Sequence, residues 1–127
     1  MNLTHAGLVF LGGGAGSVAR FALTTSTVGL SARWPVGTIL CNAFGCAAAG
    51  AFAALLDAKA NLSAETRLLV MTGFLGGLTT FSAMSHETLT LVRTGHAINA
   101  AAYALGSLVV ALAAVSGGWL ACRAAIS

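Results

Sequence analysis

The sequence predicts an all-α membrane protein with four transmembrane helices, and three observations indicate this fold class. Hydrophobic residues make up 57% of the chain and charged residues 7%, whereas a soluble protein carries roughly a quarter charged residues. About 20 apolar residues cross a bilayer, so 127 residues have room for four spans and little else. Short polar loops separate apolar runs of this length. We therefore expect a single domain, residues 1–127, that consists of the four spans.

The first span is expected at residues 3–28. Gly12 and Gly16 have the small-xxx-small spacing that lets helix backbones approach closely. Arg20 lies in the second half of the span, and an ionisable residue inside a membrane is a functional-site candidate by default. The alternative is that Arg20 extends along the helix and places its charge at the membrane surface.

The second span is expected at residues 36–56, directly after Trp34 and Pro35, which suit an interface anchor and a helix start. Asn42 lies one turn into this apolar run. Its amide either forms a helix–helix hydrogen bond worth about 0.6–2 kcal/mol or donates to an anion. The residues alone favour neither interpretation.

The third span, expected at residues 65–92, contains several residues that weaken a helix near its middle. They are Gly73, Gly76, Gly77, Thr79 and Thr80. Backbone can leave helical geometry inside a membrane only where protein buries it or where it lines a polar cavity. Transport proteins use such breaks as ion sites, because the freed carbonyls and half-helix ends act as ligands. The pattern therefore predicts a helix broken at mid-membrane and a role in ion movement.

The residues after this break suggest an anion path. Phe81 and Met84 lie on one helical face, and the edges of aromatic rings carry partial positive charge. The common alternative is that both side chains serve packing only. Glu87 is the second ionisable group expected to reach into the membrane. It follows His86, but Thr90 stands where the second histidine of a zinc HExxH motif would be.

The fourth span is expected at residues 97–121 and contains Tyr103 and Ser107. Four spans leave both termini on one side of the membrane. That side has Lys59, Arg67 and Arg123, and the other side has Arg20, Arg33 and Arg93. The positive-inside rule therefore gives no preferred orientation. Copies inserted in both directions could pair as an antiparallel homodimer, and the alternative is that a weak bias fixes one orientation.

The sequence disfavours several other functions. No Ser-His-Asp set or carboxylate pair is placed for hydrolysis, so we do not expect an enzyme. The net charge of +3 is small and scattered, which argues against nucleic-acid binding. A small multidrug-type transporter with dual topology is the main alternative, but it would need a carboxylate in the first span, where this chain has Arg20. A membrane scaffold would have no reason to break a helix or to bury Asn42.

Three motifs resemble the Fluc (CrcB) family of fluoride channels. They are GSVARF in the first span, PVGTILCNAFG at the second and GFLGGLTTFSAMSHET in the third. The resemblance covers essentially the whole chain in length, span number and motif order. It implies a dual-topology homodimer in the inner membrane, with two pores at its interface through which fluoride leaves the cytoplasm. Such a channel would confer fluoride resistance.

The resemblance also implies roles for individual residues. A central structural sodium ion would be held by the backbone carbonyls of Gly76 and Thr79. Arg20 would lie near an aqueous vestibule, and Glu87 would match the carboxylate that follows the pore aromatic pair. The residues implied to line a pore are Thr38, Asn42, Phe81, Ser82, Met84, Tyr103 and Ser107.

The chain departs from the family pattern at two positions. The family commonly reads FSTFS where this chain reads Phe81-Ser82-Ala83-Met84-Ser85. Met84 thus replaces the second pore phenylalanine, and Ala83 replaces a threonine. Methionine is flexible and polarisable but offers no rigid ring edge. We therefore expect slower conduction without a change of fold.

Overall fold

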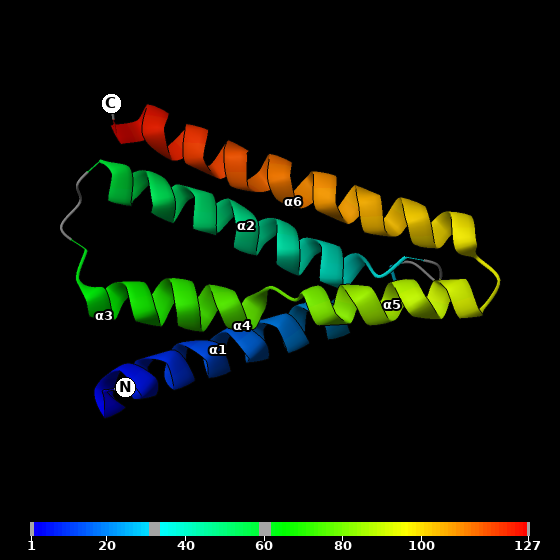
Figure 1. Ribbon diagram of the computed structural model, residues 1–127, viewed down its shortest axis with the longest axis horizontal. Coiled ribbons are helices and arrows are strands. Elements are labelled where there is room, and N and C mark those ends of the chain that lie inside the picture. Colours follow the sequence, from blue (N-terminus) through cyan, green and yellow to red (C-terminus); the bar gives the residue numbers. More distant parts are fainter. Residues whose placement is uncertain (1, 31–33, 59–61, 127) are drawn as a thin grey trace.

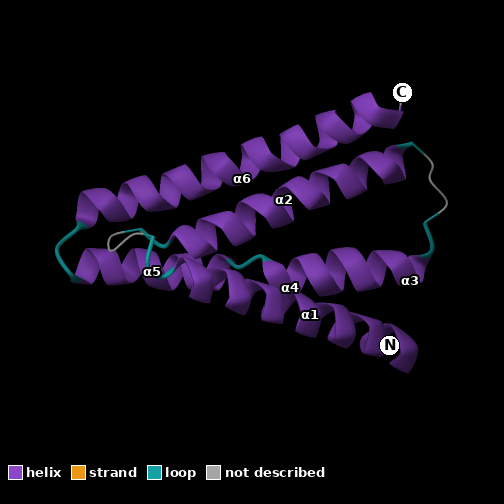
Figure 2. Cartoon of the chain, turned by 180° about the vertical axis from the view of Figure 1, so that it is seen from behind, coloured by secondary structure: helices purple, strands orange, loops and turns teal. Residues whose placement is uncertain are grey.

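A computed structural model describes residues 2–30, 34–58 and 62–126 of the chain. These residues form four helical stretches that are long and apolar enough to cross a membrane. They are Leu3–Thr27, Val36–Asp57, Ala64–Arg93 and Ala97–Ile126. Successive stretches run in opposite directions, so both termini lie at the same end of the bundle (Figures 1 and 2). The predicted all-helical, four-span fold is confirmed.

The helices pack as two pairs. Helix α2 (Val36–Asp57) runs along α6 (Ala97–Ile126), and α1 (Leu3–Thr27) crosses the first half of the third span (Figure 1). Glycine allows the close approach in both pairs. A Cβ at Gly50 would collide with the Val115 carbonyl of α6, and a Cβ at Gly12 would collide with the Leu69 carbonyl. The close packing predicted for the glycines of the first span is therefore confirmed.

The third span is interrupted about midway along its length (Figure 1). Its first half consists of α3 (Ala64–Arg67), the π-helix η1 (Leu68–Leu75) and the short α4 (Gly76–Leu78). Thr79 and Thr80 are extended, with φ/ψ of −81°/153° and −153°/118°. Helix α5 (Phe81–Arg93) then completes the span. The sequence predicted a break between Gly73 and Thr80, and the interruption lies at the C-terminal end of that segment.

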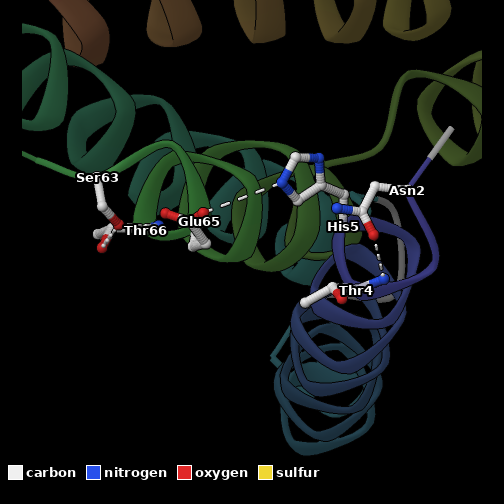
Figure 3. A network of polar contacts seen from close by, with 6 residues as sticks. All are labelled: Asn2, Thr4, His5, Ser63, Glu65 and Thr66. Carbon is white, nitrogen blue, oxygen red and sulfur yellow. Dashed lines mark hydrogen bonds and ion pairs between the residues drawn. The ribbon is translucent and has the colours of Figure 1, made fainter.

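Polar side chains begin the helices at the end of the bundle that holds the termini (Figure 3). Asn2 Oδ1 accepts a hydrogen bond from Thr4 N at 3.0 Å and so caps α1. Ser63 Oγ accepts one from Thr66 N at 3.1 Å and caps α3. His5 Nε2 lies 4.0 Å from Glu65 Oε1, which places the start of α1 beside α3.

The boundaries differ modestly from those expected. Helix α6 continues to Ile126, beyond the expected end at residue 121, and the third span begins at Ala64 and ends at Arg93. The π-helix had no signal in the sequence pattern. Two of the basic residues assigned to the sides of the membrane, Arg33 and Lys59, lie outside the described residues.

One copy of the chain has little interior. The buried apolar side chains of the described residues are Cys41, Ala54, Leu75, Ala100 and Tyr103. Large apolar side chains on every span are exposed, among them Phe10, Phe44, Phe81 and Leu105. Lipid or another protein must therefore cover most of the apolar surface.

Candidate ion pathway beside the broken helix

Asn42 binds the interrupted backbone with both ends of its amide. Asn42 Oδ1 accepts a hydrogen bond from Thr80 N at 2.7 Å, and Asn42 Nδ2 donates one to Thr80 O at 3.1 Å. Helix α2 places the side chain opposite the interruption, and the pair joins residues 38 positions apart. The helix–helix hydrogen bond considered for Asn42 is therefore present. One of its two N–H groups has no acceptor among the described residues.

The backbone hydrogen bonds of the first half-helix end at the interruption. Leu75 O accepts from Thr79 N at 3.0 Å and from Thr79 Oγ1 at 2.8 Å. Helix α5 starts anew with Thr80, whose Oγ1 accepts from Ala83 N at 3.1 Å. Between these points, the carbonyls of Gly76 to Thr79 accept no backbone hydrogen bond from the described part of the chain.

A cavity of about 460 Å³ lies beside the interruption. Its wall includes four of the residues that the resemblance assigned to a pore: Asn42, Phe81, Met84 and Ser107. Phe81 is 78% exposed on one copy of the chain. The Ser107 hydroxyl is buried near that of Tyr103 but forms no hydrogen bond with a described residue. The cavity therefore combines an apolar wall with an amide and an unpartnered hydroxyl.

A second group of predicted residues forms a hydrogen-bonded network. Thr38 Oγ1 donates to Glu87 Oε1 at 2.8 Å, and the Tyr103 hydroxyl donates to Glu87 Oε2 at 2.5 Å. The Tyr103 ring lies edge-on to Trp34, with centroids 6.4 Å apart and an interplanar angle of 69°. Both oxygens of the Glu87 carboxylate thus accept a hydrogen bond from a hydroxyl group.

Thr38 and Glu87 also line two further cavities. One, of about 360 Å³, includes Arg20 and Thr80 in its wall. The other, of about 290 Å³, includes Trp34. Arg20 and Glu87 therefore border the same space. Ser82 is not brought to any of these cavities, and its hydroxyl lies 3.2 Å from that of Thr80.

Sequence reasoning missed the roles of Thr80 and Trp34. Thr80 was noted only as a helix-weakening residue, although a threonine directly before an apolar helical segment is a helix-capping signal. Trp34 was interpreted as an interface anchor, and no short-range pattern indicates its contact with Tyr103.

The backbone carbonyl oxygens at the interruption are the groups that could bind a cation. No cluster of three His, Cys, Asp or Glu side chains occurs in the described ranges. The carbonyls of Gly76 and Thr79 have no backbone donor in the part of the chain that the structure describes. They are hard oxygen ligands, which suit Na⁺, Mg²⁺ or Ca²⁺ rather than a soft metal. The carbonyl oxygens at the interruption are thus of the chemical type that would bind the predicted sodium ion.

Comparison with known proteins gives consistent matches along the chain. Residues 7–119 match the family described as CrcB-like protein, Camphor Resistance (CrcB). The chain is 45% identical over 112 residues to the fluoride-specific ion channel FluC of Francisella philomiragia subsp. philomiragia, covering 85% of this chain and 86% of that protein. It is 41% identical over 118 residues to the FluC of Rhizobium leguminosarum bv. trifolii, covering 92% and 94%. The FluC of Rhizobium etli is 41% identical over 123 residues, covering 96% and 98%.

Proposed function

Because this chain belongs to the CrcB family, we propose that it forms a passive, fluoride-selective channel that lets fluoride leave the cell across its inner membrane. The observation that carries this proposal is the cavity beside the interrupted third span, with Asn42, Phe81 and Ser107 in its wall. Helix α1 contains Arg20 and no carboxylate, which argues against the small multidrug-type alternative.

The cavity offers the kinds of contact that an anion needs. Stripping water from fluoride is costly, so donors must replace the lost hydration. The free N–H of Asn42, the Ser107 hydroxyl and the positive edge of the Phe81 ring are such groups. None of them is a fixed positive charge, which would hold the anion too tightly for fast passage.

Charged groups border the approach to this cavity. Arg20 raises the local concentration of anions in the 360 Å³ space that it shares with Thr80. Glu87 would repel an anion, but Thr38 and Tyr103 hold its two oxygens. We propose that this network fixes the position of the carboxylate in the wall of that space.

Two antiparallel copies would complete the pore. Phe81 is largely exposed on one copy, so a second copy is needed to enclose the space beside it. The sequence has three basic residues for each side of the membrane, which supports insertion in both orientations. Each copy would contribute one interrupted span, which gives two pores per dimer.

A structural sodium ion is proposed at the centre of this dimer. The Gly76 and Thr79 carbonyls of two copies would provide four hard oxygen ligands. A bound sodium ion would neutralise these carbonyl dipoles and link the two copies.

Fluoride efflux from liposomes that contain the purified protein tests the proposed function. We expect fluoride to leave and chloride to be retained. Phe81→Leu should slow the efflux severalfold, because it removes the partly positive ring edge that offsets lost hydration. Phe10→Leu is the matched control, since Phe10 and Phe81 are both 78% exposed and Phe10 lies on α1. Equal release of fluoride and chloride, or fluoride release no faster than from empty liposomes, would contradict the proposal.

A further inference from the structure

The interruption of the third span leaves the carbonyls of Gly76 to Thr79 without a backbone donor in the described part of the chain. The first and the last of these carbonyls have a common feature. In a continuous α-helix each N–H donates to the carbonyl four residues earlier. Thr80 N would donate to the Gly76 carbonyl, and Ala83 N would donate to the Thr79 carbonyl. Gly76 and Thr79 are also the two residues proposed to bind sodium.

Both of these donors are bound elsewhere. Thr80 N donates to Asn42 Oδ1 at 2.7 Å, and Ala83 N donates to Thr80 Oγ1 at 3.1 Å. Each carbonyl has therefore lost its helical donor to a side-chain oxygen.

We propose that Asn42 and Thr80 are positioning residues that hold the Gly76 and Thr79 carbonyls open for a cation. This inference rests on the proposed sodium site, and neither side chain needs to touch the ion. Without these two acceptors the N–H groups of Thr80 and Ala83 would donate to the carbonyls of Gly76 and Thr79, and the segment would become continuous α-helix.

The second bond of Asn42 makes this arrangement specific. Asn42 Nδ2 donates to Thr80 O at 3.1 Å, so the amide cannot turn over without losing both bonds. The amide therefore keeps its oxygen, rather than its nitrogen, toward Thr80 N. Asparagine is the residue with a donor and an acceptor on a side chain short enough to place both against one peptide unit.

An unpartnered carbonyl inside a membrane costs several kcal/mol. The free Gly76 and Thr79 carbonyls would therefore favour either a bound cation or closure of the helix. Asn42 and Thr80 oppose closure, which leaves the cation as the remaining partner in the absence of water.

Two variants test the proposal independently. Asn42→Leu removes the acceptor for Thr80 N, and Thr80→Val removes the acceptor for Ala83 N with little change in shape. The matched controls are Asn99→Leu on α6 and Thr88→Val on α5, where the Thr88 hydroxyl bonds only the Met84 carbonyl of its own helix.

The measurement is the sodium concentration that gives half-maximal stabilisation of the purified protein against thermal dissociation, with N-methylglucamine as the replacement cation. We expect Asn42→Leu and Thr80→Val to raise this concentration about tenfold or more, since each removes one hydrogen bond that holds the site open. Thr80→Ser, which keeps the hydroxyl, should restore the wild-type value. The two controls should not shift it.

Each result has a distinct meaning. Sodium stabilisation of the wild type with an unchanged midpoint in both variants would overturn the positioning role and leave the proposed channel intact. Fluoride efflux without any sodium stabilisation of the wild type would remove the cation site, and this inference with it. The absence of fluoride efflux from the wild type would contradict the proposed function itself.

If the variants fail to fold, a measurement on the wild type alone still tests the proposal. Replacement of sodium by N-methylglucamine should move the carbonyl ¹³C resonances of Gly76 and Thr79, while the amides of Thr80 and Ala83 remain protected from hydrogen exchange. A shift of both carbonyl ¹³C resonances to α-helical values on removal of sodium would show that the ion, and not the two side chains, holds the segment open.

Discussion

Met84 stands where the family resemblance leads us to expect a second pore phenylalanine. It lines the same cavity as Phe81 but offers a mobile thioether in place of a rigid ring edge. Methionine fills similar space, so the path stays open. It lacks the ring edge, so fluoride gains less interaction energy to offset the water that it loses. We expect Met84→Phe to conduct fluoride severalfold faster, the equivalent of about 1 kcal/mol, and still to retain chloride.

Paired efflux measurements on the two forms check this prediction at equal protein density. Met71→Phe, on the π-helix and outside the cavity, is the control for adding a ring to the third span. Unchanged or slower fluoride efflux in Met84→Phe would show that a ring edge at this position does not limit conduction.

Removal of the Ser107 hydroxyl should lower fluoride efflux without lowering the stability of the protein. Its hydroxyl is buried without a hydrogen bond in the described part of the chain, and such a group costs about 1–3 kcal/mol. Ser107→Ala should therefore leave the melting temperature unchanged or higher, while fluoride efflux falls because a donor is lost. Ser116→Ala, farther along α6, is the control. A parallel loss of stability and efflux would instead indicate a packing role.

At the scale of the elements, the contact between α1 and the π-helix depends on missing side chains. A Cβ at Gly12 would collide with backbone atoms of Leu69 and Phe74, whereas a Cβ at Gly14 would meet nothing within 4 Å. We expect Gly12→Ala to destabilise the protein by about 1–3 kcal/mol and Gly14→Ala to have little effect. Thermal unfolding in detergent compares the two, and equal effects would contradict the packing.

Hydropathy predicted the four helices because each span must cover its own length of membrane with apolar residues. The interruption could also be predicted, since glycine and threonine weaken a helix locally. The π-helix could not, because the hydropathy of the segment is the same for an α-helix and for a π-helix. The bonds between Asn42 and Thr80 join residues 38 positions apart, so only the folded arrangement of two helices brings them together.

At the scale of the whole molecule, orientation follows from charge. The described residues place Arg67 and Arg123 at the end with the termini, and Arg20 and Arg93 in the opposite half. We expect a cysteine added at either terminus, in a variant without native cysteines, to be labelled from both sides of the membrane. Labelling from one side only would exclude dual insertion.

A change of that charge balance gives a second prediction. Several lysines added to the loop at residues 94–96 should fix one orientation and abolish fluoride efflux. Co-expression with a copy that carries the lysines at its C-terminus should restore efflux, because the two would then insert oppositely. Full activity of either fixed copy alone would exclude an antiparallel dimer.

The sparse interior of one copy has a consequence for how the protein responds to dilution. A pore that exists only when two copies meet obeys mass action, so at low density the number of pores should grow with the square of the number of chains. Efflux per molecule should then fall as the protein-to-lipid ratio falls, unlike that of a channel formed by one chain. A cell that makes few copies would gain less than proportional protection, and doubling its expression would more than double the rate at which fluoride leaves.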